Sequence, residues 1–171
     1  MTSFMSHPRV RLLAATLALA GAGTVQAQAA APTAMSPQAA AAMARTLPPS
    51  PDGDRLFVEL GGKAGIEAVM RDFVPRAASH PRIGHFFAKT KPDALRESLV
   101  QQVCVVAGGP CRYEGGDMQS AHADMDVRKG DFNVLVEVLQ ESMARQGVPF
   151  GVQNRLLARL APMHRDIVQA P

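Results

Sequence analysis

The sequence predicts an all-α fold, and three features indicate it. From Asp54 onward, apolar residues recur at steps of three and four, and no stretch alternates convincingly between apolar and polar residues. Glycine pairs and prolines separate these stretches, as they commonly do at helix ends. Aromatic residues are few, with seven Phe, one Tyr and no Trp in 171 residues. Leu, Val, Ala and Met, or a group that is not protein, must therefore fill the core.

The N-terminal residues predict export. Residues 1–27 resemble a secretory signal peptide, because Arg9 and Arg11 precede an apolar run too short to span a bilayer and small residues follow it. We expect cleavage near Ala27 and a periplasmic or secreted protein, with an uncleaved anchor as the alternative. Residues 28–53 are rich in Ala, Pro and Ser and predict a flexible linker. The folded domain is expected over residues 54–171, without a membrane span.

The charge pattern argues against nucleic acid as a partner. The chain has 18 basic and 15 acidic residues, and residues 1–27 contain two of the basic residues and none of the acidic ones. The remainder therefore has 16 basic against 15 acidic residues, a net charge of about +1. No basic face or stripe is visible, although nucleic-acid binding requires one.

Two helices are expected before residue 80. The first covers residues 54–60 and ends at Gly61-Gly62. The second covers residues 64–79, and Pro75 inside it predicts a bend in its last turn or an early end. Steps of three and four place one set of residues on its inner face: Ile66, Val69, Met70, Phe73 and Ala77.

A longer helix and a short one follow. Residues 91–107 predict a helix with Pro92 at its start and Gly108-Gly109-Pro110 at its end. Its expected inner face consists of Leu95, Leu99, Val103 and Val106, with Cys104 alongside. Residues 116–125 predict a short helix, for which Asp117 is a plausible N-cap.

Two more helices complete the chain. Residues 130–147 end at a glycine, and their expected inner face consists of Phe132, Leu135, Val136, Leu139 and Met143. Residues 149–169 form the last helix, in which Pro162 predicts a kink. Its expected inner face consists of Val152, Leu156, Leu160, Met163 and Ile167.

His122 is the candidate metal ligand, with Met118 four residues before it and Met125 three after. On one helix these three side chains would share a face. They could be ordinary packing in a purely structural helical domain. His122 could instead be the axial ligand of a haem lined by methionines and aliphatic residues. Alternatively, all three residues could bind copper(I) in a periplasmic copper-binding module. The copper interpretation explains the spacing, but leaves unexplained how so few aromatic residues fill the middle of the fold.

Residues 54–168 resemble a group 1 truncated haemoglobin. The resemblance rests on both glycine loops, on Phe86-Phe87, on the turn GGP-x-x-Y and on the motif M-x-x-x-H that ends at His122, in this order and spacing. It implies a globin-like 2-on-2 helical sandwich that holds one haem b (iron protoporphyrin IX), with His122 as the proximal iron ligand and Phe87 on the haem face. It also implies reversible binding of O2, CO or NO in a monomer or weak dimer, with an unidentified reductase as a further partner.

The resemblance also implies the other residues around the haem. They are Phe73, Val74, Phe86, Thr90, Leu95, Leu99, Val103, Tyr113, Met118, Met125, Val127, Phe132 and Leu135. Thr90, Arg112 and Tyr113 match places near the haem propionates, although Arg112 and Tyr113 could equally be surface residues of a turn. His85 precedes the Phe pair and is a remote candidate for a sixth iron ligand.

The departures from the family pattern concern the distal side. Many members have a tyrosine that donates a hydrogen bond to the bound gas, and Val74 stands at that position. Polar residues of the distal helix match Leu95 and Leu99, while Gln102, the nearest amide, lies about a turn further along. We therefore expect fast oxygen release, relatively tight CO or NO binding and easy oxidation of the iron, which puts NO-dioxygenase activity in doubt.

A smaller departure from the family pattern follows the proximal histidine. Asp124 and Asp126 stand where the family often has glycine. Asp tolerates left-handed backbone conformations better than most residues, so we expect the turn to survive these replacements.

Cys104 and Cys111 are seven residues apart. In an unbroken helix their Cα atoms would lie about 10 Å apart, too far for a disulfide. The helix is expected to end between them, and export to an oxidising compartment favours a bridge. The alternative is a buried Cys104 thiol beside an exposed Cys111.

Overall fold

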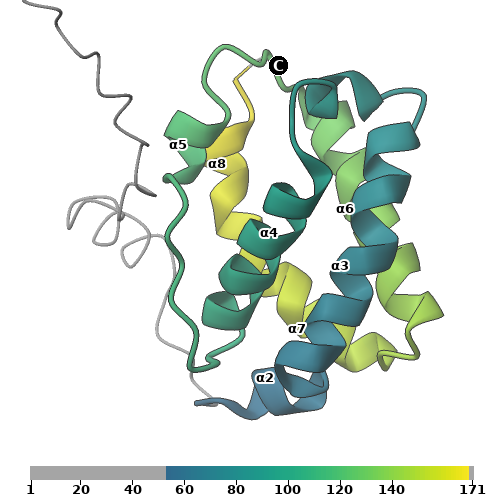
Figure 1. Ribbon diagram of the computed structural model, residues 1–171, viewed down its shortest axis with the longest axis vertical. Coiled ribbons are helices and arrows are strands. Elements are labelled where there is room, and N and C mark those ends of the chain that lie inside the picture. Colours follow the sequence, from purple (N-terminus) through teal and green to yellow (C-terminus); the bar gives the residue numbers. More distant parts are fainter. Residues whose placement is uncertain (1–52, 170–171) are drawn as a thin grey trace, which may run out of the picture. The chain divides into compact units, whose positions relative to one another are not determined.

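The computed structural model describes residues 53–169, which form helices and turns without a β-strand (Figure 1). The all-α prediction is therefore confirmed. The elements are α2 (Arg55–Glu59), α3 (Gly62–Ser79), η1 (Gly84–Phe87), α4 (Pro92–Val106), α5 (Met118–Ala121), α6 (Lys129–Arg145), α7 (Phe150–Leu160), η2 (Ala161–Met163) and α8 (His164–Ile167). The expected signal peptide lies outside the described residues, as does the expected linker except for Gly53. No helix within residues 53–169 is long and apolar enough to cross a membrane.

The core lies between α3, α4, α6 and α7. In this 2-on-2 arrangement α3 contacts α4 and α6, and α7 contacts the same two helices. Ile66, Met70, Met143 and Leu156 are at most 1% exposed and represent three of these helices. Burying one such side chain stabilises the fold by about 1.5–3 kcal/mol. As expected, the last helical segment breaks at Pro162, where α7 gives way to the 3₁₀ turn η2.

α3 continues through Pro75 to Ser79, so the alternative of an early end is wrong. Pro75 is exposed, whereas Phe73, Val74 and Ala77 around it are buried. The proline removes one intrahelical hydrogen bond on the solvent side, where water can bond to the freed carbonyl group. Packing of these buried neighbours therefore stabilises the helix beyond Pro75.

The first halves of α4 and α6 carry apolar side chains that the core covers only in part. Leu95 and Leu99 of α4 are half-buried, whereas Val103 further along the helix is buried. In α6 the side chains of Phe132, Leu135 and Val136 are half-buried, and those of Val138, Leu139, Ser142 and Met143 are buried. The expected inner face of α4 was also too narrow, since Val100 and Gln102 are buried too. The reason is that α4 packs against both α3 and α7.

The glycine turn after α4 holds the start of the domain in place. Gly108 has φ +85°, and a side chain there would collide with the carbonyl group of Gly53. A Cβ atom on Gly109 would lie 2.7 Å from Cys104 Sγ and would also collide with the Phe57 ring. The Phe57 amide donates a hydrogen bond to the Ala107 carbonyl at 3.1 Å. Only glycines allow this close approach of the turn to the residues around α2.

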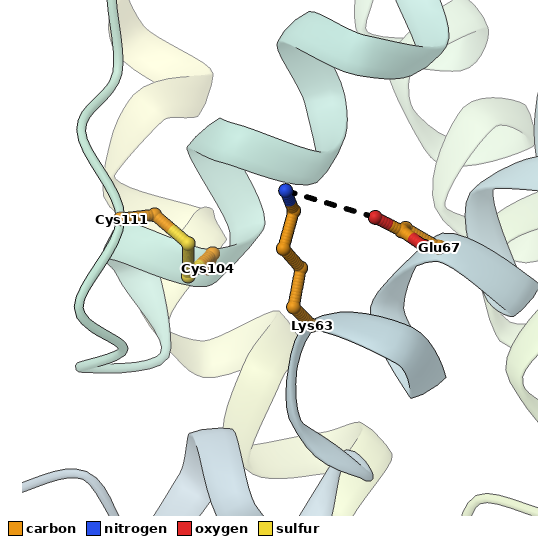
Figure 2. The surroundings of a disulfide bond; sticks show 4 residues. All are labelled: Lys63, Glu67, Cys104 and Cys111. Atoms are coloured by element: carbon orange, nitrogen blue, oxygen red, sulfur yellow. Dashed lines mark ion pairs between the residues drawn. A yellow bond between two sulfur atoms is a disulfide. The ribbon is translucent and has the colours of Figure 1, made fainter.

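Cys104 and Cys111 form a disulfide, with Cα atoms 5.8 Å apart. Figure 2 shows the bond between α4 and the loop that leads away from it, with the Lys63–Glu67 ion pair nearby. The helix ends at Val106, and the turn at Gly108 lets the chain fold back. The expected bridge is therefore present, and the alternative of two free thiols is wrong.

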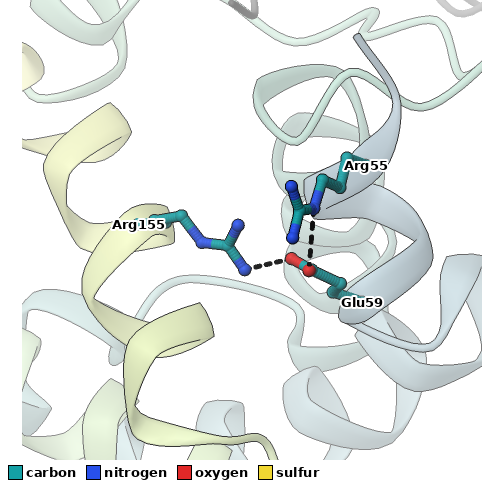
Figure 3. Close-up of polar contacts among 3 residues, drawn as sticks. All are labelled: Arg55, Glu59 and Arg155. Carbon is teal, nitrogen blue, oxygen red and sulfur yellow. Dashed lines mark hydrogen bonds and ion pairs between the residues drawn. The ribbon is translucent and has the colours of Figure 1, made fainter. Parts of the chain in front are cut away.

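A charged contact links α2 to α7 (Figure 3). The Glu59 carboxylate accepts hydrogen bonds from Arg55, one turn earlier on α2, and from Arg155 of α7. The Glu59 side chain is 29% exposed, so solvent screens the pair. Its structural effect is to join segments that are 96 residues apart in the sequence.

We predict that reducing the disulfide lowers the free energy of unfolding by about 2 kcal/mol, because the bridge restricts the unfolded chain within a short loop. Urea unfolding with and without a dithiol reductant measures the difference. The control is a Cys104→Ala/Cys111→Ala variant, which should not respond to the reductant. Equal unfolding midpoints for the oxidised and reduced wild-type protein would contradict the prediction.

Candidate functional site

The apolar and aromatic pocket residues expected from the sequence all belong to one hydrophobic cluster, and the polar Thr90 is the exception. Phe73, Val74, Val103, Tyr113 and Val127 are buried in it, and Phe86, Phe87, Leu95, Leu99, Met118, Met125, Phe132 and Leu135 pack against it partly buried. These residues come from α3, η1, α4, α5, α6 and the connecting loops. Thr90 is exposed and stands apart, with its amide donating a hydrogen bond to the Phe87 carbonyl at 2.9 Å. Elements far apart in the sequence thus expose apolar surface around a shared core.

His122 lies at the C-cap of α5 and is half-buried. Its Nδ1 atom is 2.8 Å from the carbonyl oxygen of Met118. A carbonyl oxygen can only accept a hydrogen bond, so Nδ1 carries the proton in the neutral ring. Nε2 is then left with a free lone pair, which is the state in which imidazole binds a metal.

α5 is short and depends on its cap. The Asp117 carboxylate accepts hydrogen bonds from the Ser120 amide at 2.7 Å and from the Ser120 hydroxyl at 3.0 Å. These bonds lower the pKa of the Asp117 carboxyl group, the amide bond contributing most. The expected N-cap is confirmed, and it holds the four-residue helix that precedes His122.

The backbone after His122 leaves the helix at once. α5 ends at Ala121, and both Asp124 and Asp126 have positive φ angles, 60° and 52°. Met125 therefore does not lie on a helix with His122, which removes the spacing argument for a copper site formed with Met118. The expectation that the two Asp residues accommodate the turn is confirmed, because both adopt the left-handed conformation.

Gln169 was not identified from the sequence as a residue that contacts this region. The side-chain amide of Gln169 donates a hydrogen bond to the His122 carbonyl at 2.7 Å, and its backbone amide donates to the Val127 carbonyl at 3.0 Å. No local pattern signals this contact, because it spans 47 residues.

Tyr113 is buried inside the loop between α4 and α5, so the alternative that it is a surface residue is wrong. Its hydroxyl donates to the Gly116 carbonyl at 3.0 Å, and a side chain on Gly115 would collide with its ring. Burial raises the pKa of the Tyr113 hydroxyl. Arg112 is exposed, and its guanidinium lies 3.9 Å from the Glu114 carboxylate.

The side-chain amide of Gln102 contacts two methionine sulfurs. Gln102 is buried, and its Nε2 atom donates to Met118 Sδ at 3.1 Å and approaches Met163 Sδ at 3.7 Å. Val74, Leu95 and Leu99 have no side-chain hydrogen-bond donor. Gln102 thus supports the segment that carries His122.

A cavity of about 540 Å³ opens at one edge of the cluster. It is lined by Arg82, His85, Phe86, Met125, Asp126, Arg128 and Asp131. Arg82 forms an ion pair with Asp131 at 2.7 Å and lowers the pKa of that carboxyl group. His85 is exposed, and the centroid of its ring lies 4.0 Å from the centroid of the Phe86 ring. His85 therefore lines the same cavity as the loop after His122. This position gives no support for a role as a sixth iron ligand.

Within residues 53–169, no three His, Cys, Asp or Glu residues are placed to share a metal ion. A metal held through His122 would therefore need ligands other than a cluster of these four residue types within this part of the chain. A porphyrin provides four nitrogen ligands to iron, so a single protein imidazole is sufficient for haem.

Comparison with known proteins agrees with this geometry. Residues 55–169 match the model of the family described as bacterial-like globin. The chain is 30% identical over 113 residues to the group 1 truncated hemoglobin GlbN of Nostoc sp., covering 66% of this chain and 96% of the relative. It is 28% identical over 118 residues to the group 1 truncated hemoglobin LI410 of Chlamydomonas moewusii, covering 68% and 69% of the two chains.

A solved structure shows the same fold. The truncated hemoglobin of Tetrahymena pyriformis in its Fe(III) form superposes with a TM-score of 0.65 at 24% identity, covering 67% of this chain and 98% of that one.

Proposed function

The chain belongs to the bacterial-like globin family, and on that premise we propose that it holds one haem b and binds small gaseous ligands reversibly through it. His122 is the proposed iron ligand. The observation that supports this role best is the 2.8 Å contact between its Nδ1 atom and the Met118 carbonyl, because it leaves Nε2 free to coordinate iron.

The residues present fit a haem. The ring is flat and largely apolar, and the partly buried side chains of Phe86, Phe87, Leu95, Leu99, Met118, Met125, Phe132 and Leu135 offer a matching surface. When bound, the haem supplies an iron centre that takes up O2, CO or NO. The protein supplies the axial imidazole, excludes water with its aliphatic side chains and determines which ligands are retained.

The structure gives no support to the alternative of a copper-binding module. Met125 lies beyond the end of α5, and the sulfur of Met118 accepts a hydrogen bond from Gln102. Ligand storage, scavenging or sensing fits the apolar distal residues better than NO-dioxygenase turnover, which would need a bound oxygen that is retained long enough to react.

We also propose that the protein is exported through a cleaved signal peptide. The Cys104–Cys111 disulfide supports an oxidising location, since such bonds are rare in the cytosol. The intact mass of the protein recovered from a periplasmic extract should correspond to a chain that begins near Gln28. A full-length chain confined to the cytosol would contradict this proposal.

The central test is the His122→Ala variant. Wild-type protein from haem-supplemented cells should show a strong absorption band at the violet edge of the visible spectrum, and His122→Ala should lose most of it because the axial ligand is gone. His85→Ala is the control and should keep the band. A colourless wild-type protein that takes up Cu(I), or a variant that retains full haem content and an unchanged spectrum, would overturn the proposal.

The second test adds a distal hydrogen-bond donor. Val74→Tyr should slow oxygen dissociation by roughly ten- to a hundredfold relative to Val74→Phe, because a hydrogen bond to a partly charged acceptor contributes about 1.5–3 kcal/mol. The phenylalanine variant matches the added ring and lacks only the hydroxyl. Stopped-flow measurement of oxygen dissociation gives the rates. Equal rates in the two variants, or slow release from the wild-type protein, would show that Val74 is not on the distal side.

A further inference from the structure

We propose that Gln169 is a positioning residue that sets the orientation of the His122 imidazole. This inference rests on the proposed haem-binding function and adds a support of the iron ligand that lies 47 residues away in the sequence. The two hydrogen bonds of Gln169 secure both ends of the segment from His122 to Val127.

The two bonds act at different places. The side-chain Nε2 of Gln169 donates to the His122 carbonyl at 2.7 Å, and the backbone amide donates to the Val127 carbonyl at 3.0 Å. Gln169 lies two residues after the end of α8, which contacts α5, and Figure 1 shows the two helices side by side. The C-terminal segment therefore supports His122 through contacts with its carbonyl group and with α5.

The segment between these two bonds has little support of its own. Its backbone takes the left-handed conformation at Asp124 and Asp126, which costs free energy for residues other than glycine. The other amide that bonds to the His122 carbonyl is that of Met125, at a longer 3.3 Å. Without the Gln169 side chain, the His122 carbonyl would therefore be held only by this weaker turn contact.

The backbone at His122 determines where the imidazole points. The ring is fixed on one side by the Nδ1 contact with Met118, and the peptide group is fixed on the other side by Gln169. A displacement of the backbone at His122 moves the Cα atom from which the imidazole projects, and it therefore changes the direction of the Nε2 lone pair. Gln169 itself is exposed, so its side chain adds little to the hydrophobic core.

The test uses the full-length protein and side-chain variants that leave the backbone bond to Val127 in place. Gln169→Ala removes the donor, and Gln169→Glu keeps the size of the side chain but cannot donate at neutral pH. Gln146→Ala is the matched control, because Gln146 is an exposed glutamine at the C-cap of α6. We expect the iron–histidine stretching band in the resonance Raman spectrum of the ferrous protein to shift in both Gln169 variants and not in the control.

Two further measurements separate positioning from general stability. Transfer of haem to excess apomyoglobin should accelerate by roughly two- to tenfold in Gln169→Ala, as the loss of one hydrogen bond implies. In the haem-free protein, amide hydrogen exchange should increase over residues 123–127, while the urea midpoint should stay within error of the wild type. Unchanged Raman band and haem-transfer rate in a haem-loaded Gln169→Ala protein would overturn this inference and leave the proposed function standing. A wild-type protein that takes up no haem would overturn both.

Discussion

The hydrogen bond between His122 Nδ1 and the Met118 carbonyl is the contact on which the interpretation of the site depends. It uses a carbonyl group of the last helical turn and leaves one ring nitrogen available. Both partners belong to α5 and its C-cap, and a helix of four residues is not stable without contacts to the rest of the chain. Asp117 caps the front of this segment, Gln102 contacts the sulfur of Met118 from α4, and Gln169 holds the far end. One local contact and two distant ones thus support the segment that carries the imidazole.

The residues proposed for the distal side have different chemistry. α3 and α4 contribute Val74, Leu95 and Leu99, which offer shape and exclusion of water without hydrogen bonds. The polar amide that α4 does carry, Gln102, faces the methionine sulfurs instead. The polar contacts around α5 therefore support the proposed iron ligand, whereas the proposed distal side offers only apolar packing to retain a gas. In the proposed haem protein, such a division favours CO over oxygen, because bound oxygen gains more from a nearby donor.

Much of the fold could be predicted from the sequence because its signals are local. The glycine turns, the Pro162 break, the Asp117 cap and the apolar period of α3 each act within a few residues. The disulfide could be anticipated for the same reason, since the helix end lies between its two cysteines.

Most differences between the predictions and the structure come from tertiary contacts. α3 continues past Pro75 because its neighbours are buried, and Gln102 of α4 is buried where it contacts Met118 and Met163. The short helix expected over residues 116–125 ends at Ala121 for a local reason, because the chain turns at Asp124 before it reaches Met125. Gln169 carried no sequence signal, because a side chain that bonds to a distant carbonyl group needs no particular neighbours.

The placement of the covalent and non-covalent restraints has a consequence for biogenesis. The disulfide joins residues seven apart, whereas the Gln169 contact with His122 joins residues 47 apart at the end of the chain. Short loops close at a smaller entropic cost than long ones. The disulfide beside α4 can thus form before the C-terminal segment has folded against His122. His122, the proposed haem ligand, receives its last restraint only after the C-terminal residues have been made, and the proposed function therefore places haem binding at the end of assembly.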